Sequence, residues 1–90
     1  MGPLVHARVL ELGSTVAGPF CGRLLADFGA DVVKVETPVG DPVRSMGKHK
    51  TADNGEDVSL FAASILRNKQ LICVDMRTPE GQQVIKDLVA

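Results

Sequence analysis

Aromatic side chains are scarce in this 90-residue chain, which contains three Phe and neither Trp nor Tyr. Proteins that bind single-stranded nucleic acids commonly stack the bases on such rings, so this mode of binding is not expected. No sign of charge predominates either, since 10 Lys and Arg residues oppose 11 Asp and Glu residues. A basic surface that would attract a nucleic acid is therefore not indicated, and we expect no nucleic-acid partner.

Long apolar runs are also missing. No stretch approaches the roughly 20 apolar residues that cross a bilayer, and His6, Arg8 and Glu11 interrupt the first run, unlike a secretory leader. We therefore expect no membrane partner and a cytoplasmic location. The two cysteines, Cys21 and Cys73, lie in apolar patterns. They are interpreted as reduced core residues, and a disulfide or a reactive thiol is the alternative.

Spacings typical of metal and dinucleotide sites are absent as well. His6 and His49 are isolated from each other, and no Cys and His spacing is that of a zinc site, so no metal is expected. Gly18 and Gly22 do not form the Gly-rich dinucleotide fingerprint, and Glu36 alone is weak evidence for ribose binding. A nicotinamide-binding domain is therefore only a third alternative.

Three short segments are typical of β-strands: Arg8–Leu12, Asp31–Glu36 and Leu71–Asp75. The second contains three valines, a near-continuous apolar run that indicates a strand covered on both faces. Because helical patterns separate the strands, we expect an α/β fold, namely a Rossmann-like parallel sheet with βαβ crossovers.

A helix is predicted after the first strand. Pro19 suits its first position and Gly18 its cap, while Gly29 is placed to end it in a left-handed conformation. Apolar residues recur along it at helical spacing and predict one buried stripe. The stripe consists of Cys21, Leu24, Leu25 and Phe28.

The second half of the chain begins with an irregular segment. Residues 37–57 are predicted to be a long loop, and loops of this length are usually functional or disordered. Ser59–Leu66 is interpreted as a short helix, with Leu60, Ala63 and Leu66 roughly on one side. Thr78 is predicted to cap a last helix that Pro79 and Glu80 begin. The buried face of that helix is expected to hold Val84, Ile85, Leu88 and Val89.

Ninety residues suffice for a single domain. However, three strands and two principal helices leave apolar surface uncovered, and no strand follows the last helix. We therefore expect residues 1–90 to be an incomplete part of a larger domain, and we expect the uncovered apolar face to self-associate.

Several blocks of residues occur along the chain in a fixed order and spacing: 8–12, Ala17-Gly18-Pro19, 25–36, 40–44, Asn68-Lys69 and 75–81. Together they resemble the N-terminal part of family III CoA-transferases. The family contains formyl-CoA transferase, carnitine CoA-transferase and α-methylacyl-CoA racemase, and the resemblance extends from Val9 to Leu88. It implies that the chain is the N-terminal part of a CoA-binding Rossmann-like domain, which in full-length members forms an interlocked homodimer.

The resemblance also implies the chemistry. Family transferases move CoA between an acyl-CoA and a carboxylic acid through an aspartate that forms a mixed anhydride. The equivalent of that aspartate lies beyond Ala90, so no catalytic residue is expected here. A long connection between Asp41 and Asn68 favours a transferase over the racemase, which abstracts a proton next to the thioester carbonyl. A non-catalytic CoA-binding or assembly module is the alternative from another class.

Cofactor contacts are carried over by position. Val16 and Ala17 lie in a loop before a helix, where free N–H groups await an acceptor; an ordinary turn is the alternative. Val16 stands where the formyl enzyme has glutamine, and Thr37 where it has an arginine near CoA. Lys69 is expected to orient a loop or to face phosphate, unless it is a solvated lysine. A second CoA-contacting stretch comprises Val74, Asp75, Met76 and Arg77.

Two further assignments in these loops, the role of Arg77 and the pairing of Asp41 with Arg44, each have a simpler alternative. The Arg77 guanidinium could hold a phosphate with two hydrogen bonds, whereas the alternative is an ordinary surface arginine. Asp41 and Arg44 are considered as a pair that locks a turn, and simple turn chemistry is the alternative.

Overall fold

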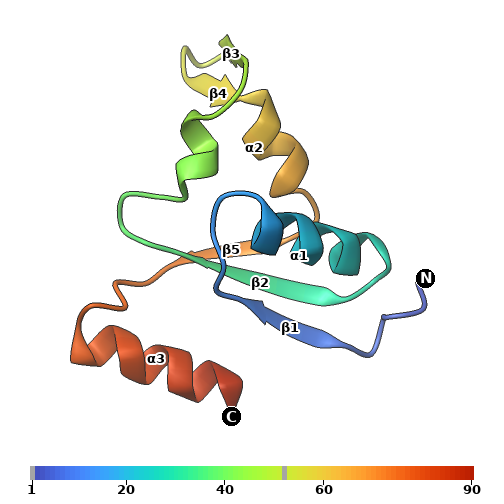
Figure 1. The fold of residues 1–90 in the computed structure, drawn as a ribbon, viewed down its shortest axis with the longest axis vertical. Helices are drawn as coiled ribbons and strands as arrows, with labels where there is room; N and C mark the ends of the chain where they lie inside the picture. Colours follow the sequence, from blue (N-terminus) through green and yellow to red (C-terminus); the bar gives the residue numbers. More distant parts are fainter. Residues whose placement is uncertain (1, 52) are drawn as a thin grey trace.

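The computed structural model describes residues 2–51 and 53–90. Positions 1 and 52 of the expected domain lie outside the described residues, and position 52 also belongs to the predicted loop. At the centre is a parallel three-stranded sheet with the strand order β1-β2-β5 (Figure 1). The α/β fold with a parallel sheet, predicted from the sequence, is thereby confirmed. The strands are β1 (Arg8–Glu11), β2 (Asp31–Glu36) and β5 (Gln70–Cys73).

The strand register brings three loops to one edge of the sheet. Glu11, at the end of β1, is level with Lys34 of β2, and Glu36, at the end of β2, is level with Cys73 of β5. All three strands therefore end on the same side of the molecule (Figure 1). In open α/β sheets this carboxyl edge is where ligands bind.

Helix α1 (Ala17–Asp27) covers one face of the sheet. Val16, rather than the predicted Gly18, is its N-cap. Gly29 follows the helix with φ of +104°, a left-handed conformation that glycine adopts without steric cost, as predicted.

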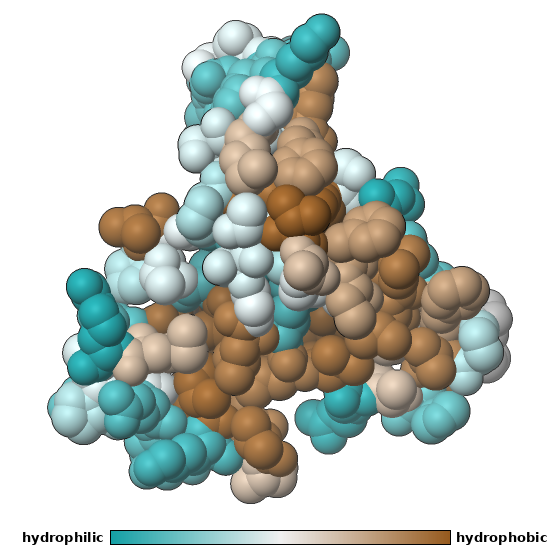
Figure 2. Space-filling view, in the orientation of Figure 1, coloured by the Kyte–Doolittle hydropathy of each residue, from teal (hydrophilic) through white to brown (hydrophobic). Residues whose placement is uncertain are grey.

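The face that α1 turns to the sheet differs from the predicted stripe. Pro19, Gly22 and Ala26 are buried, whereas Leu24 and Phe28 are exposed. Small residues let the helix lie close to the strands, and two of the predicted large residues point away. Figure 2 shows apolar surface over this part of the molecule.

Two apolar clusters form the core. The first lies between α1 and the sheet and is built on Ala26, Ala30 and Val32. The second is built on Val43, Ala62 and Ile65. Ala62 and Ile65 are the buried residues of α2 (Leu60–Ile65). The buried side of this helix therefore differs from the predicted one, of which Leu60 and Ala63 are exposed.

Residues 37–57, predicted to be mostly loop, are irregular over most of their described length but also contain regular elements. The segment contains the 3-10 helix η1 (Pro42–Ser45) and strand β3 (His49–Thr51), and it reaches β4 (Asp57–Ser59). Strands β3 and β4 pair antiparallel at a polar tip of the molecule (Figures 1 and 2). Ser59 then caps α2, accepting a hydrogen bond from the Ala62 N–H.

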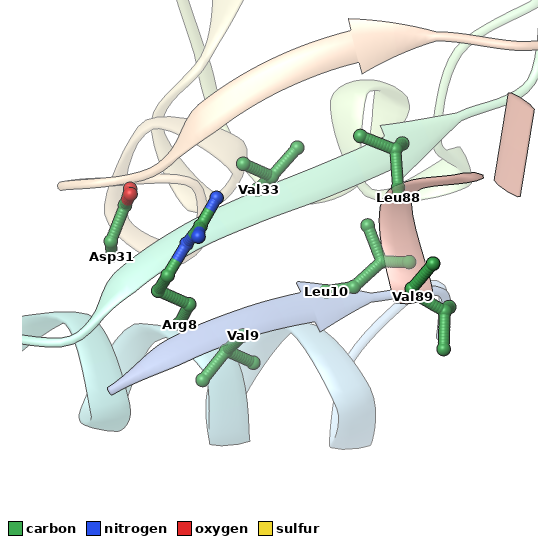
Figure 3. A pocket seen from close by; sticks show the side chains of 8 residues that line it. Arg8, Val9, Leu10, Asp31, Val33, Leu88 and Val89 are labelled. Atoms are coloured by element: carbon green, nitrogen blue, oxygen red, sulfur yellow. The ribbon is translucent and has the colours of Figure 1, made fainter. Parts of the chain in front are cut away.

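Helix α3 (Pro79–Val89) begins as predicted, with the Thr78 Oγ1 accepting from the Gly81 N–H. Its predicted buried face is wrong: Val84, Leu88 and Val89 are 43%, 46% and 69% exposed. A cavity of about 460 Å³ separates part of this face from the sheet. In Figure 3, Leu88 and Val89 lie on α3, opposite Leu10 and Val33 of the sheet.

The cysteines depart from the core interpretation. Cys21 and Cys73 are both free, so no disulfide joins them, and both are exposed rather than buried. Among the described residues, no helix is both long enough and apolar enough to cross a membrane.

Candidate functional site

Four charged side chains are buried together beneath the carboxyl edge of the sheet. We call Glu11, Lys34, Asp41 and Lys69 the ionic cluster. Their side chains are between 0% and 5% exposed. Glu11 and Lys34 are neighbours on paired strands, so the sheet register itself places their opposite charges together.

Lys34 is the centre of the cluster. Its Nζ atom lies 2.8 Å from Asp41 Oδ2 and 3.2 Å from Glu11 Oε2. It also donates a hydrogen bond of 2.9 Å to the carbonyl oxygen of Gly13. A buried ammonium needs such partners, since an unpaired charge in the protein interior costs several kcal/mol.

Lys69 completes the cluster from the start of β5. Its Nζ lies 2.6 Å from Glu11 Oε1 and donates a 2.7 Å hydrogen bond to the carbonyl oxygen of Pro19. The side chain is 0% exposed, so the alternative of a solvated lysine is wrong. These contacts attach Lys69 to the first turn of α1 and leave it inside the protein.

Asp41 binds two backbone N–H groups in addition to Lys34. Its Oδ1 accepts from Thr15 at 3.0 Å and from Val43 at 2.9 Å. Burial raises the pKa of Asp41, but the hydrogen bonds from Lys34, Val43 and Thr15 outweigh this effect and hold the pKa below its usual value. Asp41 is therefore an anionic anchor for the loop that follows β1.

The side-chain pair of Asp41 and Arg44 does not form, and the alternative of simple turn chemistry is confirmed, since the Asp41 side chain caps η1 by accepting from the Val43 N–H. Arg44 instead pairs with Glu36, its Nε lying 3.1 Å from both carboxylate oxygens and its Nη2 2.9 Å from Oε1. Only the backbone joins the predicted partners, through the Arg44 N–H and the Asp41 carbonyl oxygen. The Asp41 side chain instead faces Lys34, because the neighbouring ammonium compensates the charge of the buried carboxylate.

The loop between β1 and α1 holds the predicted contacts Val16 and Ala17. Thr15 has φ of +69°, a left-handed conformation that costs a non-glycine residue about 1–2 kcal/mol. Beyond it, Val16 is 42% exposed and Ala17 begins α1 on the surface. The first N–H groups of a helix have no partner within the helix, so the start of α1 leaves backbone donors at this exposed end.

The predicted contacts after β5 form a short turn. The Val74 N–H donates to the Glu36 carbonyl oxygen and so continues the pairing with β2. Asp75 accepts from the backbone N–H and the Nε of Arg77, at 3.0 and 3.1 Å. This pairing lowers the pKa of Asp75 and raises that of Arg77. Arg77 is 86% exposed, and Met76 lies between the paired residues, half-buried.

Thr37 follows β2 between these two loops and is exposed, its Oγ1 donating to the Gly40 carbonyl oxygen. The sheet thus places the predicted contacts of three loops along one edge, while Lys69 lies below it. Two cavities of the described part of the chain lie elsewhere. One faces α3, and the other, of about 450 Å³, adjoins α2 and β4.

Sequence reasoning missed Glu11 and Lys34. A signal was present: Lys34 stands among the valines of the strand predicted to be covered on both faces, where a charged side chain requires a buried partner. Within the described residues, no group of three His, Cys, Asp or Glu side chains is placed to hold a metal ion.

The chain belongs to CoA-transferase family III, whose model matches residues 4–90. It is 53% identical over 88 residues to succinyl-CoA–D-citramalate CoA-transferase of Chloroflexus aurantiacus, covering 97% of this chain and 21% of that protein. It is 44% identical over 91 residues to succinate–glutarate CoA-transferase of Agrobacterium fabrum, covering 97% and 22%. The chain thus spans about a fifth of the length of these relatives.

Solved structures share the fold. A CAIB/BAIF family protein from Brucella suis superposes with a TM-score of 0.87 at 39% identity, covering 98% of this chain and 23% of that one. A hypothetical protein from Mycobacterium tuberculosis superposes with a TM-score of 0.81 at 32% identity, covering 98% and 23%. The family resemblance inferred from the sequence blocks is confirmed.

Proposed function

We propose that the chain is the N-terminal, CoA-binding part of a transferase that moves CoA from an acyl-CoA to a carboxylic acid. The observation that carries the proposal is the match of residues 4–90 to CoA-transferase family III. The geometry supports it, since three loops end at one edge of a parallel sheet, which is a common ligand position in α/β folds.

The residues at this edge suit the chemistry of CoA. The molecule carries a diphosphate and a 3′-phosphate, which need cations and N–H donors. The exposed Arg77 guanidinium and the N–H groups at the start of α1 supply both. Val16, Ala17 and Thr37 would contact CoA from two loops, and residues 74–77 from the third. Lys69 would orient the first loop from below.

The substrates we propose are a succinyl-type acyl-CoA and a small dicarboxylic acid. The relatives' names mention succinyl-CoA with D-citramalate, and succinate with glutarate. The catalytic aspartate expected for the family is outside these 90 residues, so the chain by itself would bind CoA without transferring it. The racemase is less favoured, because these relatives are transferases.

The remaining expectations are part of the same proposal. Residues 1–90 would form the N-terminal part of a Rossmann-like domain, acting without a metal in a cytoplasmic enzyme. A homodimer is proposed for the full-length enzyme. The exposed apolar residues of α1 and α3 support this proposal, because such surfaces are commonly buried against another protein surface.

Binding and activity measurements test the proposed function. Calorimetry of the purified 90-residue chain with free CoA should show binding, and a succinyl-CoA transfer assay of that chain should show no turnover. Residues 4–90 should also replace the matching segment of the Chloroflexus relative and leave its transferase activity largely intact. Absence of CoA binding, together with an inactive chimaera that folds, would refute the proposal. Matched titrations with NADH examine the nicotinamide alternative, which predicts binding of NADH and none of CoA.

A further inference from the structure

We propose that Lys34 and Asp41 are positioning residues for the loop that binds CoA, residues 13–17. The inference rests on the proposed function, because it assigns to the ionic cluster the task of holding that loop in its binding conformation. Neither side chain would touch CoA, since both are 1% exposed and lie beneath the loop.

The cluster binds the loop and the following turn at three backbone atoms. Lys34 holds the carbonyl oxygen of Gly13, and Asp41 holds the N–H of Thr15. Lys69 holds the carbonyl oxygen of Pro19. Each contact joins a charged, buried side chain to a neutral backbone group, and hydrogen bonds of this type are about twice as strong as neutral ones.

The loop needs such anchors because its conformation is strained and crowded. Thr15 has φ of +69°, which a threonine does not favour in an unconstrained loop. Gly13 and Gly18 approach so closely that a Cβ on Gly18 would lie 3.0 Å from the Gly13 Cα. The anchors at Gly13 and Thr15 hold the backbone in this arrangement immediately before the exposed Val16 and Ala17.

Folding alone does not require these charges. A buried ion pair replaced by apolar side chains of similar size is often neutral or stabilising, because the desolvation of both charges is avoided. Stability therefore gives no general reason to prefer these charges to apolar side chains, whereas the positioning of the loop does. The positioning role predicts that affinity for CoA and stability respond differently to the same replacement.

The experiment uses the 90-residue chain and two charge-balanced variants. Lys34→Met with Asp41→Leu removes the anchors at Gly13 and Thr15 together and leaves the Glu11–Lys69 pair in place. Lys34→Met with Asp41→Asn removes the Gly13 anchor, but the Asn carbonyl oxygen can still accept from Thr15. Ile65→Val is the control, because it weakens the second apolar cluster without contacting the loop.

Each protein is measured in three ways: by calorimetry with CoA, by hydrogen exchange of the Thr15 amide, and by the midpoint of thermal unfolding. For Lys34→Met with Asp41→Leu we expect the Kd for CoA to rise about tenfold or more and the protection of the Thr15 amide to be lost. The Asn variant should lie between this variant and wild type. Ile65→Val should lower the midpoint and leave the Kd and the Thr15 protection near wild type.

Three results would overturn the inference. The first is wild-type affinity in the Leu variant or, where that variant does not fold, in the Asn variant. The second is a loss of affinity in Ile65→Val that matches the Leu variant, since stability would then explain both. The third is a wild-type chain that binds no CoA, which refutes this inference and, together with an inactive chimaera that folds, the proposed function as well. The first two leave the proposed function standing, so the two failures are distinguishable.

Discussion

Lys34 Nζ lies 2.8 Å from Asp41 Oδ2, with both side chains 1% exposed. The pair joins the central strand to the turn that follows it, and through the Thr15 N–H it reaches the loop after β1. A single ion pair thus connects two of the three loops at the carboxyl edge. In the positioning role that we propose, this buried pair holds the CoA-binding loop in addition to the sheet.

Removing the ammonium alone should destabilise the chain. Lys34→Met leaves Asp41 without its cation and Glu11 with Lys69 only, and breaking a buried pair typically costs about 3–5 kcal/mol. The double replacement Lys34→Met with Asp41→Asn should recover a large part of that loss. Urea unfolding of both single variants and the double variant gives the coupling energy. A loss below about 1 kcal/mol for Lys34→Met would contradict this account of the cluster.

Gly22 should not tolerate a methyl group. On helix propensity alone, Gly22→Ala would stabilise α1 by about 1 kcal/mol. A Cβ there would overlap the Glu11 carboxylate and lie 3.2 Å from Lys69 Nζ, so the ion pair must move. We expect a net loss of about 2 kcal/mol in urea unfolding.

A second glycine serves as the control for this steric effect. A Cβ on Gly55 meets nothing within 4 Å, although its φ is +87°. Gly55→Ala should therefore cost only about 1 kcal/mol, from backbone strain. Stabilisation by Gly22→Ala would show that Glu11 and Lys69 accommodate the methyl group without cost.

Acid should weaken the chain through Asp41. Its pKa in the folded chain is below the ordinary value of 3.8, so the ionised form stabilises the fold above that pH. The contribution is lost as the pH falls through the lower, folded value. The difference in unfolding free energy between wild type and Asp41→Asn should therefore shrink between about pH 5 and pH 2.

Urea titrations at several pH values measure this difference, and Asp53→Asn, at an exposed position, controls for the removal of a carboxylate. A difference between wild type and Asp41→Asn that stays constant, or grows, on acidification would argue against the assigned hydrogen bonds.

The apolar face of α3 should make the isolated chain self-associate. Val84 and Leu88 are 43% and 46% exposed on the same helix, and apolar surface of this kind favours association. Val84→Gln with Leu88→Gln should reduce the average mass in sedimentation experiments. Gln83→Ala with Asp87→Ala alters the polar side of the helix and should not reduce it. A wild-type chain that is monomeric at high concentration would be incompatible with this expectation.

Local signals predicted much of the fold. The Thr78 cap, the left-handed Gly29 and the valine-rich second strand each depend on residues close in sequence, and the structure has all three. The order of strands and helices was enough to predict the parallel sheet. From this the common edge of the three loops followed, because parallel strands end on the same side.

Other features depended on contacts that local patterns do not contain. The large apolar residues of α1 predicted its buried face, but the close approach to Glu11 selects Gly22 for that position. The β3–β4 pair was missed because its strands are short and mostly polar. Asp41 was weighed as a partner of Arg44, a neighbour in sequence, against simple turn chemistry, whereas the cation that it pairs with, Lys34, precedes it on β2.

The sequence by itself determined the family, the α/β order of elements and the loops that reach the carboxyl edge, because these follow from short-range patterns and from blocks of residues in register. Only the tertiary structure decided which charges meet inside the protein. Glu11 and Lys69 are far apart along the chain, yet the sheet brings their side chains to 2.6 Å. Charges removed from water must find such partners, and it is the packing of the strands against α1 that supplies them.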